Sequence, residues 1–203
     1  MAEFTIGLLL NLSRRISEAI NIVRVGEWKQ GDLLWMCGQG LHGSNIGIFG
    51  LGRIGYAVAK RLKNFDVNKI LYYNRNRNVE AEKELECEYT DLNGLLESSD
   101  FLIVTCAATK ETERLFNYDK FKRMKKNSIF INVSRGSVVN QEDLCRALKE
   151  KLILAAGLDV CTPEPLPLSS ELLQLDNCFV TPHIGSADVS TRIKMAMISA
   201  NNI

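Results

Sequence analysis

The 203-residue sequence predicts an α/β fold built on a doubly wound parallel sheet. Two observations carry this prediction. Candidate strands and helices alternate along the chain, and the strands are nearly continuous apolar runs, as is typical of strands covered by helices on both faces. In addition, a short apolar strand at 46–49 leads through a glycine-rich turn into an amphipathic helix. The composition, 46% hydrophobic and 24% charged, is ordinary for a globular protein, and the length suits one large domain or one and a half.

The first predicted element is one long helix over residues 3–25. Its apolar side chains recur every fourth residue, at Phe4, Leu8, Leu12, Ile16 and Ile20. Gly26 can end this helix. The next segment, 31–44, is rich in glycine and shows no hydrophobic period, so we predict a loop.

Beyond this loop the alternation is regular. Strands are predicted at 46–49, 69–73, 101–106, 128–133, 153–160 and 178–180. Helices are predicted after the glycine turn and over 79–85, 91–96, 118–124, 141–151, 171–175 and 189–201. Asp91 or Thr90 is the expected cap of the helix at 91–96. The proline-rich segment 162–168 must be irregular.

The segment 50–55, Gly-Leu-Gly-Arg-Ile-Gly, lies between a strand and a helix, which is the context in which this pattern indicates dinucleotide binding. Gly50 permits the tight turn, Gly52 lets the backbone approach a pyrophosphate, and Gly55 lets the helix pack closely on the strand. The helix N-terminus at Arg53 and Ile54 offers free N–H groups to phosphate. The plain alternative is an ordinary tight turn.

The turn after the second strand bears on the choice of dinucleotide. An acidic residue at this place normally holds the ribose 2′-hydroxyl of NAD. Here the turn reads Asn74-Arg75-Asn76-Arg77 and offers no carboxylate. A 2′-phosphate could be held by Arg75, with Arg77 nearby, so the sequence favours NADP(H), with NAD(H) as the second choice. A solvated polar turn is the plain alternative.

Polar residues also stand where the later strands end. Arg135, Asp159 and His183 each come at or just beyond the end of an apolar run, on the edge of the sheet where ligands of open parallel sheets bind. Glu164 follows in the proline-rich loop. A histidine with a carboxylate partner can act as a general acid, and an arginine can hold a substrate carboxylate. Each residue alone is more readily a turn arginine, a capping aspartate or a structural histidine; their joint placement favours a site.

Several function classes are disfavoured. The formal net charge of +1 gives no electrostatic footprint for nucleic acid or an anionic membrane. The apolar run at 4–13 is too short to span a bilayer, and no basic segment precedes it as in a signal peptide. The six cysteines form no C-x-x-C pair, which favours reduced thiols in a cytoplasmic protein. With two histidines and no cysteine cluster, we expect no metal site.

Four motifs in this order resemble the D-isomer-specific 2-hydroxyacid dehydrogenases, over nearly the whole chain. They are the glycine segment 50–55, 131–136 (INVSRG), 156–160 with Glu164-Pro165 (AGLDV, EP) and 181–187 (TPHIGSA). Within that family the chain is most similar to members that reduce glyoxylate and hydroxypyruvate. The resemblance implies a Rossmann-type domain and the NADPH-dependent reduction of a small 2-oxo acid to the D-2-hydroxy acid.

The resemblance also implies roles for individual residues. Arg135 would hold the substrate carboxylate and carbonyl, His183 would protonate the carbonyl oxygen as hydride arrives, and Glu164 would pair with His183. Asp159 would line the nicotinamide site. The expected cofactor contacts are Gly50, Gly52, Arg53, Ile54, Gly55, Asn74, Arg75, Asn76, Arg77, Ala107, Val133, Asp159, His183, Gly185 and Ser186.

Members of this family carry a second, substrate domain beside the cofactor domain. By the resemblance we expect an interdomain helix over 1–25, the NAD(P)-binding domain over 26–186, and a helix over 187–203 that returns toward a substrate domain absent from this chain. We therefore expect this chain alone to bind NADPH and to turn over substrate slowly or not at all. Related enzymes pair through this domain, so a homodimer is expected.

Two other functions stay open from the sequence. Co-repressors of the C-terminal-binding type share the fold, sense dinucleotides, and keep the residues that match Arg135, Glu164 and His183. The Asn74–Arg77 turn suits an NADPH enzyme better than such a sensor. The third possibility is a cofactor-binding fragment without turnover. The identity of the 2-oxo acid is not fixed by these residues.

Overall fold

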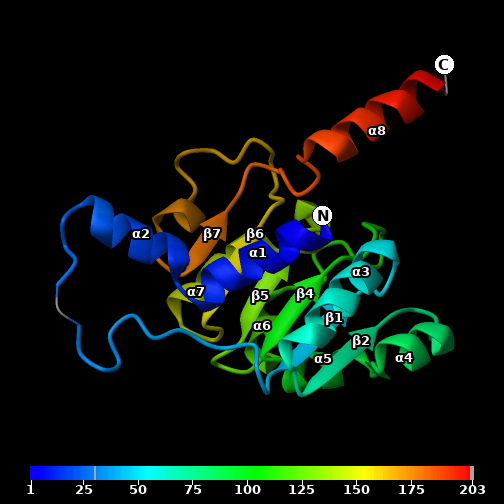
Figure 1. The fold of residues 1–203 in the computed structure, drawn as a ribbon, viewed down its shortest axis with the longest axis horizontal. Helices are drawn as coiled ribbons and strands as arrows, with labels where there is room; N and C mark the ends of the chain where they lie inside the picture. Colours follow the sequence, from blue (N-terminus) through cyan, green and yellow to red (C-terminus); the bar gives the residue numbers. More distant parts are fainter. Residues whose placement is uncertain (30, 202–203) are drawn as a thin grey trace.

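A sheet of seven parallel strands forms the centre of the protein in a computed structural model that describes residues 1–29 and 31–201. The strands are β1 (Asn45–Phe49), β2 (Lys69–Tyr73), β3 (Glu88–Tyr89), β4 (Phe101–Val104), β5 (Ile129–Asn132), β6 (Ala155–Leu158) and β7 (Cys178–Val180). Their order is β3-β2-β1-β4-β5-β6-β7, so the direction of winding reverses between β1 and β4. The predicted doubly wound parallel sheet is confirmed (Figure 1).

Helices cover both faces of this sheet (Figure 1). One hydrophobic core includes residues of α1 (Ala2–Ser13), α3 (Arg53–Leu62) and α4 (Val79–Leu85). The other includes residues of α5 (Leu92–Ser98), α6 (Tyr118–Arg123) and α7 (Gln141–Lys149). Along β4, Phe101 and Ile103 belong to the first core and Leu102 and Val104 to the second. Because successive strand residues enter opposite cores, the strands are apolar at almost every position.

The predicted single helix over 3–25 is wrong. The chain forms α1 and then α2 (Ile16–Arg24), separated by Arg15 in the left-handed conformation at φ +54°. The Asn11 side chain accepts the Ser17 N–H at 2.9 Å, which stabilises the bend. The four-residue apolar repeat runs through this break, so periodicity alone does not reveal it.

The two helices have different surroundings. The side chains of α1 pack on β5, β6 and α3, and a Cβ added to Gly157 of β6 would lie 2.5 Å from a methyl carbon of Leu12. By contrast, α2 has no buried residue. The part of the chain predicted as an interdomain helix is therefore divided into a core helix and an exposed one.

Other differences concern the ends of elements. The two-residue strand β3 was not predicted; both its residues are exposed, so no apolar run signals it. Strands β4, β5 and β6 are shorter than predicted because the flanking residues already turn into loops. The predicted helix at 171–175 is a 3₁₀ helix, Glu171–Gln174. The expected Asp91 cap is present, with its carboxylate accepting the Gly94 N–H at 2.6 Å.

The last helix, α8 (Val189–Asn201), projects from the body of the molecule (Figure 1). It contains no buried residue. Within residues 1–29 and 31–201, no helix is long and apolar enough to cross a membrane.

Candidate functional site

A cleft of about 420 Å³ opens at the carboxyl ends of β1, β2 and β4, where the strand order reverses. This is the place at which doubly wound sheets bind their ligands. Predicted cofactor residues that line it are Gly50, Gly52, Asn74, Arg75, Asn76 and Ala107. Further lining residues, which the sequence did not single out, include Tyr73, Thr105, Thr109, Glu111 and Thr112.

Each of the three positions in the turn is glycine for a different structural reason. Gly50 has φ +103°, and a Cβ there would lie 2.7 Å from the Cα of Cys106. A Cβ on Gly55 would collide with the carbonyl oxygen of Gly50. Gly52 has φ −86°, which any residue can adopt, and a Cβ there would meet nothing within 4 Å. Gly50 and Gly55 are therefore required by backbone conformation and close packing, whereas Gly52 keeps space free in the cleft.

The N-terminus of α3 lies beside Gly52 and carries no side-chain cap. Its first helical hydrogen bond runs from the Tyr56 N–H to the Gly52 carbonyl, so the N–H groups of Arg53 and Ile54 have no intrahelical acceptor. The Arg53 side chain is exposed and that of Ile54 packs on the core. Only the backbone of these two predicted residues suits a phosphate, and the positive end of the helix dipole adds to the attraction.

Asn74 has a structural task. Its Oδ1 accepts the Leu51 N–H at 2.7 Å, which fastens the glycine turn to the end of β2. Thr105 does the same from the other side, because its hydroxyl donates to the Gly50 carbonyl at 2.7 Å. The glycine turn is thus held between the ends of the two strands that flank β1.

The turn at 74–77 carries two arginines, of which one is held in an ion pair and the other pairs with no described residue. Arg77 does not line the cleft; its guanidinium pairs with Glu82 at 2.7 Å. Tyr72 donates to the same carboxylate at 2.5 Å, and hydrogen bonds from Arg77 and Tyr72 together lower the pKa of Glu82 to about 2. Arg75 is exposed, lines the cleft and has no ion pair with any described residue. Arg75 is therefore the cation that a ligand in the cleft would meet.

The end of β5 positions Arg135. Asn132 is fully buried there, and its Oδ1 accepts the Ser134 N–H at 3.0 Å and the Ser134 hydroxyl at 2.8 Å. Its Nδ2 donates to the Arg135 carbonyl at 3.0 Å. These bonds shape a turn on which Arg135 is exposed, and its guanidinium donates back to the Ser134 carbonyl at 2.6 Å. Sequence reasoning missed Asn132, although a polar residue that closes an apolar strand is a signal for such a role.

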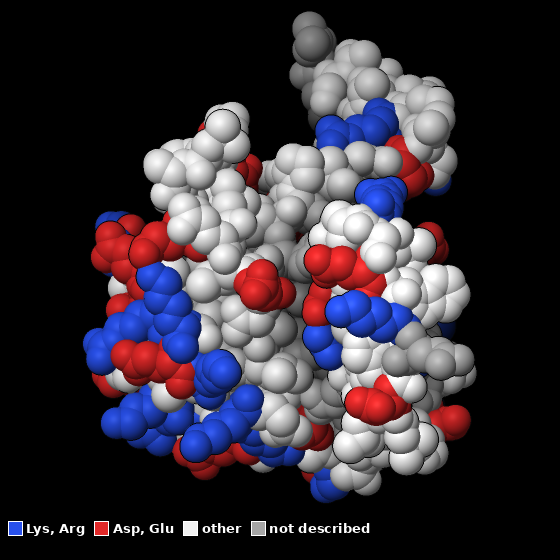
Figure 2. All heavy atoms as spheres, turned by 90° about the vertical axis from the view of Figure 1, so that its left-hand side faces the viewer, with Lys and Arg blue, Asp and Glu red and all other residues white. Residues whose placement is uncertain are grey.

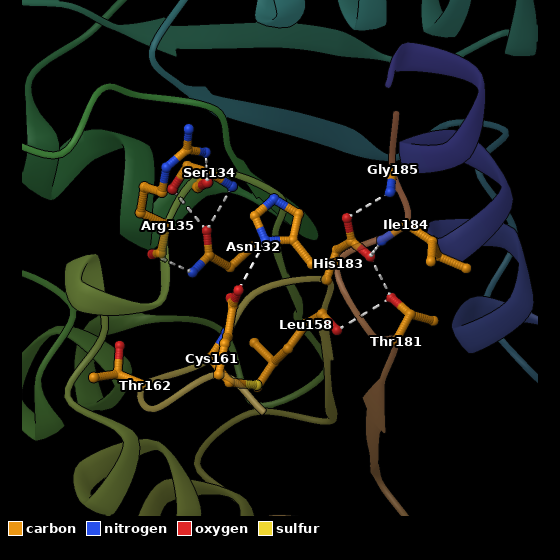
Figure 3. A network of polar contacts seen from close by, with 12 residues as sticks. Asn132, Ser134, Arg135, Leu158, Cys161, Thr162, Thr181, His183, Ile184 and Gly185 are labelled. Carbon is orange, nitrogen blue, oxygen red and sulfur yellow. Dashed lines mark hydrogen bonds and ion pairs between the residues drawn. The ribbon is translucent and has the colours of Figure 1, made fainter. Parts of the chain in front are cut away.

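His183 and Glu164 form a pair at the same edge. The imidazole Nδ1 lies 2.8 Å from Glu164 Oε2, and Oε1 accepts the Cys161 N–H at 2.9 Å. Burial opposes ionisation of Glu164, but the hydrogen bonds from His183 and Cys161, with the charges of His183 and Arg135, hold the pKa of Glu164 below its usual value. Because a carboxylate only accepts, Nδ1 carries the proton of this bond and Nε2 stays available. Figure 3 shows the His183 ring projecting toward the Asn132–Arg135 turn.

Asp159 is fully buried and caps the loop that carries His183. Its carboxylate accepts the Thr181 hydroxyl at 2.7 Å, the Ile184 N–H at 2.9 Å and the Gly185 N–H at 2.8 Å (Figure 3). His183 itself lies in the left-handed region at φ +53°, which is unfavourable for a non-glycine residue. The loop-capping alternative describes this geometry, and a contact of Asp159 with nicotinamide stays a prediction.

The remaining predicted residues are spread along the edge. Val133 is buried and its N–H binds the Val104 carbonyl, while Ser186 is half-buried. A second cavity of about 490 Å³ is lined by Asp159, Glu164 and His183, among others.

Among the residues that the structure describes, no group of His, Cys, Asp or Glu could hold a metal ion.

Comparison with known proteins identifies a family and similar chains. Residues 6–185 match the family described as D-isomer specific 2-hydroxyacid dehydrogenase, NAD binding domain. The glyoxylate reductase/hydroxypyruvate reductase of Mus musculus is 50% identical over 202 residues, which is all of this chain and 62% of that protein. The human protein of the same name is 49% identical over the same shares. The chain thus spans less than two thirds of these relatives.

A solved structure supports the same assignment. The D-lactate dehydrogenase of Lactobacillus jensenii with NAD⁺ superimposes with a TM-score of 0.87 at 28% identity, over 98% of this chain and 63% of that one. The shared sheet, the glycine turn at its switch point and the match over residues 6–185 lead to one conclusion: the chain belongs to the D-isomer specific 2-hydroxyacid dehydrogenase family.

Proposed function

We propose that this chain supplies the NADPH-binding domain and the Arg–Glu–His set of a reductase that converts glyoxylate or hydroxypyruvate to the D-2-hydroxy acid. The observation that carries the proposal is the placement of Arg135 and the Glu164–His183 pair on the same edge of the sheet as the dinucleotide cleft. The names of the mouse and human relatives support the substrate class. We place the activity in the cytoplasm, because all six cysteines are free thiols.

The chemistry divides among these residues. Bound NADPH would supply the hydride. The Arg135 guanidinium orients the substrate by a forked pair with its carboxylate. His183 gives a proton from Nε2 to the carbonyl oxygen, which gains negative charge as the hydride adds. Glu164 fixes the ring through Nδ1 and stabilises its protonated form. Asp159 keeps the His183 loop in its unfavourable backbone conformation.

Turnover is tested on the chain alone and on a chimera in which the chain replaces the matching part of the mouse relative. NADPH consumption is followed at the absorbance of its reduced ring, with glyoxylate and hydroxypyruvate as substrates. We expect the chimera to consume NADPH and the chain alone to bind it with slow or no turnover. A folded chimera that binds NADPH without consuming it would contradict the reductase and favour a dinucleotide-binding module.

The proposed NADPH preference depends on Arg75. Loss of its charge-assisted contact with the 2′-phosphate in Arg75→Ala should weaken NADPH binding by about 1.5–3 kcal/mol, or roughly ten- to a hundredfold, and leave NADH binding nearly unchanged. Calorimetric titration with both dinucleotides measures this. Arg77→Ala is the matched control, because Glu82 already holds that guanidinium. Equal affinity of the unmodified chain for both dinucleotides would refute the preference.

We further propose that the chain forms a homodimer through α2 and the segment that follows it. Large apolar side chains are exposed there: Ile16, Ile20, Val23, Val25, Trp28, Leu33, Leu34 and Trp35. Figure 2 looks onto the side where α2 lies in Figure 1 and shows uncharged residues interspersed with acidic and basic groups. An exposed apolar area of this kind is typical of a protein interface.

Analytical ultracentrifugation tests the dimer. We expect a mass of twice 22.8 kDa for the unmodified chain and a shift toward the monomer for the double variant Trp28→Glu, Leu34→Glu. Leu168→Glu is the control, since Leu168 is as exposed but lies in the proline-rich loop. A monomer at all concentrations would refute this proposal.

A further inference from the structure

Glu111 lies on the wall of the dinucleotide cleft across from Arg75. Arg75 follows β2 and Glu111 follows β4, and these strands flank β1 on its two sides. Both residues line the same cleft, with the glycine turn of β1 between their loops. A ligand that fills this cleft therefore meets a positive side chain from one wall and a negative one from the other.

The backbone that carries Glu111 is ordered by local hydrogen bonds. The Thr109 N–H donates to the Thr112 hydroxyl oxygen at 2.8 Å, and this hydroxyl donates to the Ala107 carbonyl at 3.0 Å. The Glu113 N–H donates to the Thr109 carbonyl at 3.0 Å. Glu111 is thus carried by a closed turn at the edge of the cleft.

Glu111 is ionised at neutral pH. A hydrogen bond from the Thr109 side chain, a backbone hydrogen bond and the charge of Arg75 hold the pKa of Glu111 below its usual value. Neither Arg75 nor Glu111 has an ion-pair partner among the residues that the structure describes. Neither charge is therefore neutralised by an ion pair with a described residue, and both act on a ligand in the cleft.

We propose that Glu111 is a second residue that sets the choice of dinucleotide, with a sign opposite to that of Arg75. Its carboxylate repels the 2′-phosphate that Arg75 attracts, and it can accept a hydrogen bond from a ribose hydroxyl when that phosphate is missing. A phosphate monoester carries about −1.5 to −2 charges near pH 7, so the repulsion acts on NADPH far more than on NADH. The inference rests on the proposed function, namely on a dinucleotide in this cleft with its 2′ position near Arg75.

Glu111→Gln tests this role, because it removes the charge and keeps the shape of the side chain and one acceptor oxygen. We expect NADPH to bind roughly three- to tenfold more tightly and NADH to bind no more tightly than before. The gain should shrink in high salt, which screens exposed charges. Glu113→Gln is the matched control: Glu113 is on the same segment but lines a separate cavity of about 220 Å³ beside Arg114.

The outcomes separate this inference from the proposed function. If Arg75→Ala weakens NADPH binding as expected but Glu111→Gln leaves the ratio of NADPH to NADH affinity at the value of Glu113→Gln, the role of Glu111 is refuted and the proposed function stands. An equal change for both dinucleotides, or a lower unfolding temperature that accounts for the change, also refutes it. If neither dinucleotide binds the unmodified chain, the proposed function itself fails.

Discussion

Gly52→Val should abolish measurable binding of both dinucleotides and leave the protein folded. At Gly52 the backbone has φ −86°, which valine tolerates, and a Cβ would meet nothing within 4 Å. The new side chain would instead occupy the space in which the pyrophosphate approaches the backbone. We expect affinity to fall on the order of a hundredfold or more, equivalent to about 2.8 kcal/mol. Calorimetric titration and thermal unfolding of the same preparation measure the two effects.

Gly55→Val is the matched variant, and unlike Gly52→Val it should destabilise the fold. Its Cβ would strike the Gly50 carbonyl oxygen and lie 2.8 Å from the Thr105 hydroxyl, so the turn and α3 cannot keep their packing. We expect a loss of stability of about 1–3 kcal/mol or more, seen as a lower unfolding temperature. A folded Gly52→Val variant with unchanged affinity would place the dinucleotide site elsewhere.

His183→Gln should remove most of the turnover of the active chimera. Glutamine cannot supply the proton that Nε2 gives to the carbonyl oxygen, and general acid catalysis contributes about 10²–10⁴ in rate. We expect kcat for glyoxylate reduction to fall by a factor in that range, while the Kd of NADPH changes far less. Steady-state assays and NADPH titration on the same variant separate the two quantities.

The sequence contains a natural control for this variant. His42, the only other histidine, is exposed in the loop that precedes β1, at the opposite edge of the sheet. His42→Gln should leave kcat unchanged. Glu164→Gln should cause a smaller loss than His183→Gln, because glutamine can still accept the Nδ1 hydrogen bond but does not stabilise the protonated ring. Full activity of His183→Gln would exclude His183 as the acid.

The fold could be predicted because its main signal is local. Apolar runs such as that of β4 and the strand–turn–helix around Gly50 each lie within a few neighbouring residues. Two features escaped this reasoning. The bend at Arg15 depends on contacts of Asn11 and on a left-handed backbone, which an apolar repeat does not record. The strand β3 is two exposed residues that pair with β2, and the Tyr89 ring also contacts the rings of Tyr72 and Tyr73.

The candidate site was predictable to the extent that polar residues stand at strand ends. That rule selected Arg135 and His183, and the structure places His183 Nδ1 2.8 Å from Glu164 Oε2, while the roles of these residues in catalysis stay predictions. It did not reveal which side chains are already engaged. Asn74 accepts the Leu51 N–H and Arg77 pairs with Glu82, and neither partner lies within the 74–77 turn from which the prediction was made. Glu111 lies in the loop after β4, which carries no recognisable motif, and it reaches the cleft because β4 lies beside β1 in the sheet.

The bend between α1 and α2 also determines where the cofactor domain can be cut. Leu8 and Leu12 of α1 seal the sheet above Gly157, so deletion of α1 would uncover β6 to water. Amide hydrogens of α1 should accordingly exchange with solvent as slowly as those of the central strands, whereas those of α2 should exchange early. The smallest unit that folds independently would then include α1, whereas α2, which follows the bend at Arg15, would be dispensable for folding.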